Sequence, residues 1–569
     1  MREHIYNVKN WINKALNPNN YGFILALFII LLLPTLFVAF LSTDLAESIV
    51  KKIAYLSFAF LIYLIPALFL KLRWYFLLVS VFMLAAPFEI GYVWFYKATS
   101  TDGYISSLLN TNRSEAREML FTMKEEIAFL FIIWFAYFYI VFKKIKNNFL
   151  FKIRFSILTG VVFFVFNLLL FSSMFILEYR RTHSDIRMDA VVDNFLNKYR
   201  KTYPCNYIST LIRKQKQART VQRMQIQMAS FSFDAQQPAL PDDQQIFVVV
   251  IGESARYGNF SINGYARETS PLLAKRNDLL TFSDVFASSN LTEYTFPFLL
   301  SRATPLTPEV AYKEKTFIEA FMECGFYTAW IANQASYYPY IDRIAKTVDR
   351  KYFSFNDFDQ NENYDGLLLK AIDSVLDDKA PKTLIVVHTL GSHFRYNFRY
   401  PKSFEKFTPA LEGVSDYSIL SKDNKTLIIN SYDNTILYTD YVLSEIINRI
   451  DSRNSVAALV YFSDHAENLY DDDRALVLHG SKNPSVNEIH VPLFVWTSAK
   501  YKSFYEDKQK SLEANINKKI SLSNLFYSIL DIAGISYPGE ELEKSFASGS
   551  FKEDSVRYVY TANQEVIHF

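Results

Sequence analysis

The chain has 569 residues, of which 17% are aromatic and 21% charged, and a formal net charge of +2. It is too long for one ordinary domain, and its near neutrality gives no electrostatic reason to expect nucleic acid as a partner. The mean hydropathy of +0.03 is unusual for a soluble protein of this size. This average combines a strongly apolar first third with a remainder of globular composition.

Five apolar segments occupy the first third. They are Tyr21–Leu41, Ile53–Leu72, Trp74–Phe95, Ile127–Phe142 and Phe155–Leu177. A helix needs about 20 apolar residues to cross a bilayer, and only the fourth segment, which is uncharged, is short. The first segment is too long for a cleaved signal peptide, and repeated spans disfavour the alternative of buried soluble helices. We predict five transmembrane helices over residues 1–177, with Glu89 facing the bundle interior or the interface.

Charges between these segments predict the orientation. Basic residues occupy the amino terminus and the loops after the second and fourth segments: Arg2, Lys9, Lys14, Lys71, Arg73, Lys143, Lys144, Lys146, Lys152 and Arg154. In a five-span chain these regions lie on one side, while the loop Asp44–Lys52 is charge-balanced. The positive-inside rule places the basic side in the cytoplasm. Everything after about Leu177 is therefore expected outside the cytoplasmic membrane.

A polar segment, residues 178–243, follows the last apolar segment. We expect amphipathic bridging helices along the membrane surface, ending in a turn-rich linker at Gln237–Asp242. Its basic residues, such as Lys214 and Arg219, either touch anionic head groups or form a solvated helix face. The chain's two cysteines, Cys205 and Cys324, can pair in an oxidising compartment, but two cysteines do not make a disulfide framework.

From residue 244 to 569 the pattern is that of a globular α/β domain. Apolar β-rich runs occur at Ile246–Ile251, Thr383–Val387, Val456–Phe462 and Val491–Trp496. Amphipathic helical stretches occur between or after them, at Phe317–Met322, Gly366–Leu376, Ser431–Ile450 and Leu522–Ala533. Strands that alternate with helices predict a mainly parallel sheet with helices on both faces.

Metal-binding residue types gather where these strands end. Glu253 follows the first run, and Asp464 and His465 follow the third. Ligands of open α/β sheets bind at the carboxyl edge, and carboxylate and imidazole donors suit Zn²⁺. We predict that these three residues hold zinc and leave a fourth position for water or a nucleophile.

A hydroxyl-rich segment at residues 286–297 can supply that nucleophile. A Ser or Thr at a helix start faces unpaired amides that can hold a phosphate, and a metal can lower the pKa of its hydroxyl. Spacing alone does not choose among Ser288, Ser289, Thr292 and Thr295. Ser254 is a further candidate, or a cap of its turn.

Six motifs in this order resemble the phosphoethanolamine transferases of lipid A and lipopolysaccharide core, including the mobile colistin-resistance enzymes, within the alkaline phosphatase and sulfatase superfamily. The matching pieces are residues 252–256, 263–271, Gly391-Ser392-His393, residues 432–435, residues 463–467 and Leu478-His479-Gly480. The resemblance covers nearly the whole chain. It implies five spans, a bridging segment and a periplasmic sulfatase-like catalytic domain.

The resemblance also assigns roles. Thr292, five residues before Pro297, matches the nucleophile and a metal ligand, beside Glu253, Asp464 and His465. Four further positions match residues that bind the phosphate, a second zinc or the ethanolamine phosphate: His393, His479, Asn333 and Glu467. The implied zinc-dependent reaction moves phosphoethanolamine from phosphatidylethanolamine, through a phospho-threonine, to lipid A or lipopolysaccharide. A zwitterion on lipid A would weaken binding of cationic peptides such as polymyxin.

Two departures from the family and several alternatives complete the interpretation. Ser288 and Phe298 stand where many relatives have cysteines, and Ala466 replaces a glycine, which is tolerable unless the backbone needs a positive φ. A glycerol-phosphate transferase, a phosphodiesterase or sulfatase-like hydrolase, and a non-catalytic receptor are the rival functions. No Cys or Ser followed by x-Pro-x-Arg occupies the nucleophile position, which disfavours a sulfatase activity. We expect a monomer with an acceptor that the sequence leaves open.

Overall fold

The computed structural model describes residues 21–43, 49–110, 124–146, 149–151, 153–182, 188–200, 202–238, 243–334, 339–353, 363–411 and 422–569. The amino-terminal basic residues, the loop residues 44–48, Lys152 and linker residues 239–242 lie outside this set. The chain forms two compact units. The first comprises Met1–Ser100 and Met123–Lys214, and the second comprises Thr101–Thr122 and Gln215–Phe569.

Helices cover all five apolar segments of the first unit. They are α2 (Tyr21–Leu41), α3 (Ile49–Ala67), α4 (Leu72–Val79) with α5 (Ala86–Tyr96), α8 (Lys124–Tyr139) and α9 (Ile153–Thr182). Among the described residues, Gly22–Leu41 and Ile153–Arg180 are each long and apolar enough to cross a membrane. A third span is present if α4 and α5 count as one bent pair. The count of five spans therefore stays a prediction.

The third apolar segment is broken instead of forming the continuous helix that we expected. A 3₁₀ turn at Ser80–Leu84 separates α4 from α5, and the two parts bend by 43°. Pro87 lies in the first turn of α5, where a missing N–H is tolerated because first-turn amides have no helical partner. A proline inside a continuous helix would remove a hydrogen bond, which explains the break at this point.

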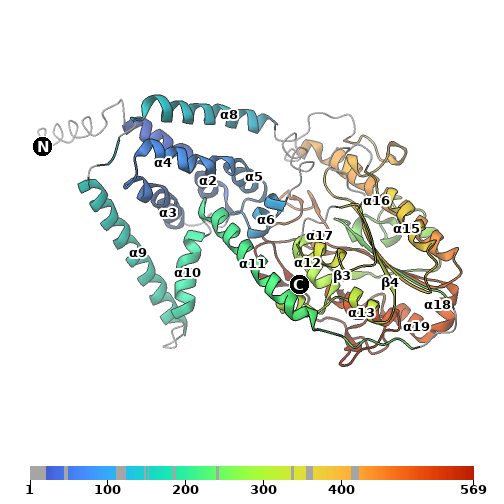
Figure 1. The fold of residues 1–569 in the computed structure, drawn as a ribbon. Helices are drawn as coiled ribbons and strands as arrows, with labels where there is room; N and C mark the ends of the chain where they lie inside the picture. Colours follow the sequence, from blue (N-terminus) through green and yellow to red (C-terminus); the bar gives the residue numbers. More distant parts are fainter. Residues whose placement is uncertain are drawn as a thin grey trace, which may run out of the picture. The chain divides into compact units, whose positions relative to one another are not determined.

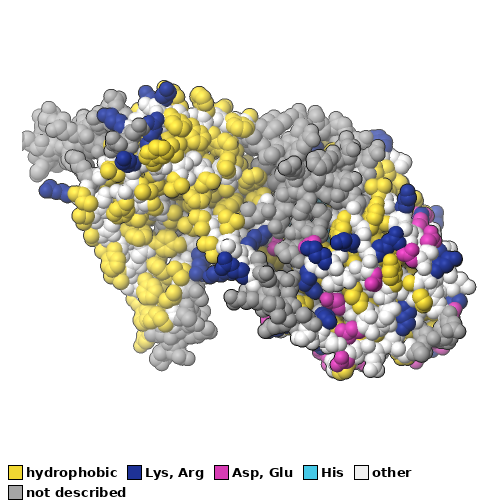
Figure 2. Space-filling view, viewed as in Figure 1, with side chains coloured by type: hydrophobic (Ala, Val, Ile, Leu, Met, Phe, Trp, Pro, Cys, Tyr) yellow, Lys and Arg dark blue, Asp and Glu magenta, His cyan; other side chains and the backbone are white. Residues whose placement is uncertain are grey.

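Much of the described surface of the first unit is apolar, as is expected of helices in a bilayer. Figure 2 shows hydrophobic side chains over much of its visible face, and Phe135, Leu158 and Phe164 are among the exposed ones. Glu89 instead is buried, where its carboxylate accepts hydrogen bonds from Ser100 Oγ at 2.7 Å and Asn206 Nδ2 at 3.1 Å. Of the two expected placements, interior or interface, the burial of Glu89 within the first unit favours the interior. Helices α10 (Met188–Arg200) and α11 (Cys205–Ala229) follow.

The second unit is built on a seven-stranded sheet (Figure 1). Its order is β2 (Leu279–Thr281), β10 (Leu493–Thr497), β7 (Val456–Ser463), β1 (Gln245–Gly252), β6 (Lys382–His388), β4 (Tyr327–Ala332) and β5 (Arg350–Phe353). The five strands from β7 to β5 are parallel, whereas β10 and β2 pair antiparallel. The four strands predicted from apolar runs are present, and the mainly parallel sheet is confirmed.

Helices cover both faces of this sheet. Alternate side chains of a strand point to opposite faces, so strands that are apolar throughout present two apolar faces, and each needs a layer of helices. Phe247, Val249 and Ile251 of β1 share one core with α12 (Thr292–Leu300), α13 (Phe317–Glu323) and α20 (Leu525–Ile532). On the other face, α15 (Leu367–Leu376) and α16 (Lys425–Asp451) pack on each other and on β4 and β7. Both faces are thereby buried, which explains why β1 and β7 are apolar throughout.

Candidate metal centre

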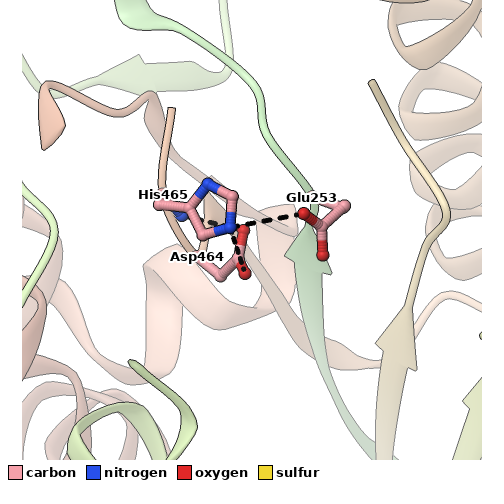
Figure 3. A group of neighbouring side chains, drawn as sticks. All are labelled: Glu253, Asp464 and His465. Carbon is pink, nitrogen blue, oxygen red and sulfur yellow. Dashed lines mark hydrogen bonds and ion pairs between the residues drawn. The ribbon is translucent and has the colours of Figure 1, made fainter. Parts of the chain in front are cut away.

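Neighbouring parallel strands bring Glu253, Asp464 and His465 together. Gly252 of β1 pairs with Ser463 of β7, so the next residues, Glu253 and Asp464, leave the sheet side by side. In the described part of the chain these three residues form the one group that could hold a metal, with ligand atoms all within 4.8 Å of one another. Figure 3 shows their side chains converging beyond the tip of β1.

The protonation of these groups suits a divalent cation. Burial lowers the pKa of His465 to about 3, and its Nδ1 donates to the Ala466 carbonyl at 3.1 Å, so Nε2 is the ring nitrogen that carries the lone pair. Burial and the charge of Glu253 raise the pKa of Asp464 well above its ordinary value. Asp464 Oδ2 is buried without a hydrogen-bond partner among the described residues. A cation here would stabilise both carboxylates in their ionised forms.

Thr292 faces this cluster from the first position of α12. Its Oγ1 lies 3.1 Å from His465 Nε2 and 3.4 Å from Glu253 Oε2. The hydroxyl is mostly buried, with 7% of the residue exposed. Because Thr292 begins the helix, the backbone amides of the first turn lie beside it.

The other hydroxyl candidates point elsewhere. Ser288 Oγ contacts the hydroxyls of Ser521 and Ser523 at 3.3 and 2.8 Å. Ser289 Oγ accepts from the amide of Leu291, and Thr295 Oγ1 donates to the Leu291 carbonyl. Within the hydroxyl-rich segment, Thr292 is thus the candidate whose hydroxyl contacts the Glu253 and His465 side chains.

Ser254 connects the two metal-binding segments. Its hydroxyl donates to Glu253 Oε1 at 2.8 Å, and its backbone amide donates to Asp464 Oδ1 at 3.3 Å. The Ser254 carbonyl accepts from Tyr432 Oη at 2.7 Å. Ser254 is fully buried with a φ of 58°, a left-handed conformation that costs energy for a non-glycine residue. Ser254 therefore does more than cap a turn: it orients both carboxylates.

Two of the predicted phosphate-side residues, His479 and Glu467, form a second group beside the first. The rings of His479 and His465 lie 3.9 Å apart, and His479 Nδ1 is 3.0 Å from Glu467 Oε1. Burial acts to lower the pKa of His479, but the carboxylates of Glu467, Glu253 and Glu488 together raise that pKa above its ordinary value. Glu467 also accepts from Tyr396 Oη, and His393 Nδ1 donates to the Phe394 carbonyl at 2.7 Å.

His479, unlike Glu253 and Asp464, does not follow a parallel strand of the main sheet. It follows β9 (Val477–Leu478), which pairs antiparallel with β8 (Asn468–Leu469) in a separate two-stranded sheet. The strand after it, β10, is antiparallel in the main sheet. A loop excursion, and not the sheet edge, therefore delivers His479.

Asn333 hydrogen-bonds to the scaffold, and its neighbour reaches the metal centre. The role of Asn333 beside the ethanolamine phosphate stays a prediction. The buried Asn333 amide donates to Asp365 Oδ1 at 2.9 Å, and Asp365 in turn accepts from the amides of Leu390 and Gly391. Gln334 Nε2 donates to Glu253 Oε2 at 3.1 Å and to the Thr389 carbonyl at 2.8 Å. We missed Gln334 because strand β4, whose end it follows, was not among the predicted strands.

The two departures from the family pattern are accommodated. Ser288 takes part in the hydroxyl cluster with Ser521 and Ser523, and the Phe298 ring packs edge-on against Tyr560 at 6.0 Å. Ala466 is not among the described residues with positive φ, so a side chain is tolerated there. Cys205 and Cys324 are both free thiols.

Comparison with known proteins agrees with this fold. The sulfatase family model matches residues 245–535, just over half of the chain and the whole sheet with its metal centre. The chain therefore belongs to the sulfatase family. This class is defined here by a mainly parallel sheet whose carboxyl edge carries the acidic and histidine ligands.

Among its relatives is phosphoethanolamine transferase EptC of Escherichia coli (strain K12), 31% identical over 322 residues, which cover 55% of each chain. Kdo(2)-lipid A phosphoethanolamine 7''-transferase of the same strain is 30% identical over 276 residues, 47% of each chain. The chain thus matches about half the length of these curated relatives.

Solved structures extend the likeness. The crystal structure of the EptC periplasmic domain in complex with Zn has a TM-score of 0.53 and 28% identity, and covers 58% of this chain and 94% of that one. The integral membrane protein EptA from Neisseria meningitidis has a TM-score of 0.71 at 21% identity, and covers 92% of this chain and 97% of that one. The fold, including the amino-terminal helical region, therefore resembles that of EptA.

Proposed function

We propose that this protein is a zinc-dependent phosphoethanolamine transferase that moves phosphoethanolamine from phosphatidylethanolamine to lipid A or lipopolysaccharide core. The observation that carries the proposal is the Thr292 hydroxyl, which lies within 3.4 Å of both Glu253 and His465. The curated relatives EptC and the Kdo(2)-lipid A 7''-transferase support the group that is transferred, and the second name supports lipid A as an acceptor.

The ligand set fits zinc. Glu253, Asp464 and His465 would hold the ion, and Thr292 Oγ would take the fourth position. When bound, zinc lowers the pKa of a ligated hydroxyl and offsets phosphate charge. The zinc complex of the EptC domain supports this choice of metal.

The first transfer step uses Thr292 as the nucleophile. Its Oγ attacks the phosphorus of phosphatidylethanolamine, and the Oγ–P bond forms as the bond between phosphorus and the glycerol oxygen breaks. The hydroxyl proton of Thr292 is released, the glycerol oxygen takes up a proton, and diacylglycerol leaves. First-turn amides of α12 and the side chains of His393 and His479 bind the phosphate oxygens, while Glu467 holds His479 in place.

The second step returns the enzyme to its starting state. An oxygen of the acceptor, a lipid A phosphate or a core sugar, attacks the same phosphorus. The bond to Thr292 Oγ breaks, Thr292 recovers its proton, and the acceptor leaves as a phosphodiester. A covalent intermediate that is held by one residue lets a donor and an acceptor use the same site in turn.

The apolar first unit is the basis for a proposal on where the protein is located. We propose a monomeric, multi-pass protein of the inner membrane, with five spans in residues 1–177, bridging helices in 178–243 and a periplasmic catalytic domain in 244–569. The apolar surface of the helices and the resemblance of the fold to the integral membrane protein EptA support this arrangement. Both proposed substrates are lipids, so anchoring beside a bilayer confines the reaction to two dimensions.

Expression of the full chain in a bacterium that lacks such enzymes tests the proposal. Mass spectrometry of lipid A should show the gain of one phosphoethanolamine, which the Thr292→Ala variant abolishes. Formation of diacylglycerol from phosphatidylethanolamine, measured with the purified protein, tests the donor separately. A folded, zinc-loaded protein that consumes no phosphatidylethanolamine would refute the proposal, whereas consumption without a change in lipid A would point to another acceptor.

A further inference from the structure

A short helix that precedes the fourth apolar segment contacts the residues on either side of Thr292. Helix α6 (Asp102–Asn110) follows α5 in the chain, yet it belongs to the same compact unit as the sheet. Like Ala562 near the carboxyl terminus, α6 lies outside the residues that match the sulfatase family. Its contacts are therefore additions to the family core.

The first contact reaches the residue before Thr292. The backbone amide of Gly103 donates to the Ala562 carbonyl at 2.8 Å. A Cβ at Gly103 would lie 2.3 Å from Leu291 Cδ1 and 2.7 Å from the Ala562 carbonyl oxygen. Leu291 is the residue at the N-cap of α12. Any side chain at position 103 would therefore displace backbone or push Leu291, and only glycine permits this approach.

The second contact reaches the residue after Thr292. Ser106 Oγ donates to the carboxylate of Glu293, and Ser106 is buried. Glu293 lies in the first turn of α12, where an acidic side chain also interacts favourably with the helix dipole. Gly103 and Ser106, one turn apart on α6, thus contact the residues on either side of Thr292.

Ala562, near the carboxyl terminus, connects α6 to the segment that precedes Thr292. Its backbone amide donates to Asn290 Oδ1 at 3.0 Å, while its carbonyl accepts from Gly103. Asn290 Nδ2 donates to Glu488 Oε2 at 2.8 Å and to the Ser481 carbonyl at 2.9 Å. The chain around Thr292 is consequently held from α6, from the carboxyl-terminal segment and from the loop after β9.

We propose that α6 is a brace for the nucleophile, and that Gly103 and Ser106 are positioning residues for Thr292. The inference rests on the proposed role of Thr292 in transfer. Thr292 begins its helix, so a small shift of α12 moves Oγ1 away from Glu253 and His465. Misplacement of a reacting group by about 1 Å can cost on the order of 100-fold in rate. The brace makes catalysis depend on a segment that lies more than 180 residues before Thr292 in the chain.

Full-length Gly103→Ala protein in detergent tests the brace, with Gly258→Ala as the matched control because a Cβ at Gly258 meets nothing within 4 Å. Two readouts are needed: turnover of phosphatidylethanolamine to diacylglycerol, and hydrogen exchange of the peptide that contains residues 291–300. We expect Gly103→Ala to lower kcat by about 10- to 100-fold, with bound zinc unchanged and exchange of the α12 amides increased. Gly258→Ala should match the wild type in both.

A milder variant keeps the test informative if Gly103→Ala does not fold. Ser106→Ala should lower kcat about 3- to 10-fold, since one hydrogen bond to a carboxylate is lost. A Ser106→Ala/Glu293→Ala double variant should then lose no more than Glu293→Ala alone, because both changes remove the same contact. Additive losses, or equal exchange and turnover in Gly103→Ala and Gly258→Ala, would overturn the brace. If the wild type consumes no phosphatidylethanolamine, the proposed function fails, and the exchange measurement alone decides the inference.

Discussion

The metal ligands and the nucleophile are positioned by different kinds of structure. Glu253 and Asp464 leave adjacent parallel strands in register, so two buried strands and their backbone hydrogen bonds determine the separation of the carboxylates. Thr292 instead lies on α12, and its neighbours are held by α6, Ala562 and Ser481 from distant parts of the chain. Ligand geometry is thus a property of the sheet, whereas nucleophile geometry depends on long-range contacts. Metal binding and transfer should therefore be separable by mutation.

The largest expected effect is the loss of transfer without loss of metal. Thr292→Ala removes the proposed nucleophile, and transfer should fall by at least about 1000-fold. Because Glu253, Asp464 and His465 remain, inductively coupled plasma mass spectrometry should still find zinc in the purified variant. A Thr292→Ala protein that kept its transfer activity would remove Thr292 from the mechanism.

Loss of a sheet-borne ligand should have the opposite signature. Asp464→Ala removes one of three protein ligands, so both bound zinc and transfer should be nearly abolished. The exposed Asp472→Ala is a matched control, since Asp472 pairs with Arg474 at the surface. Zinc content that is equal in the two variants would mean that the ion binds elsewhere.

A smaller effect on metal affinity is expected at Ser254. Ser254→Ala removes the hydroxyl that orients Glu253 while retaining a Cβ, and zinc affinity should fall about 10- to 100-fold, as is typical for partners of metal ligands. Competition with a chelator measures this directly. Ser254→Gly separates the two properties of the residue, because it relieves the left-handed backbone but lacks the hydroxyl. An affinity equal to that of the wild type in Ser254→Gly would show that backbone strain, and not the hydroxyl, matters.

The smallest effect should come from substitution of Ser288, which stands where many relatives have a cysteine. Ser288→Ala removes the buried contacts to Ser521 and Ser523, which should lower the free energy of unfolding by about 1 kcal/mol. Thermal unfolding of the variant measures the change, and zinc content should be unaltered. A large loss of transfer at unchanged stability would mean that Ser288 aligns α12 as well as stabilising it.

Several parts of the fold followed from local patterns, because burial on both faces leaves a readable apolar run. The strands β1, β6, β7 and β10 were predicted in this way, as was the convergence of Glu253 with Asp464 and His465. Strand β4 was missed, and with it Gln334, whose amide holds Glu253. The break at Ser80–Leu84 was also missed, since an apolar composition does not distinguish one helix from two.

The sequence by itself determined the chemistry: an apolar helical third, an α/β domain, and acidic and histidine ligands at strand ends, with Thr292 assigned by resemblance. Only the tertiary structure decided which hydroxyl faces the ligands, that Ser254 connects Glu253 to Asp464, and that α6 contacts both neighbours of Thr292. The physical reason is the distance along the chain over which each feature is determined. Residue types and strand ends depend on nearby sequence, whereas the alignment of a nucleophile depends on segments that are close in space and hundreds of residues apart in the chain.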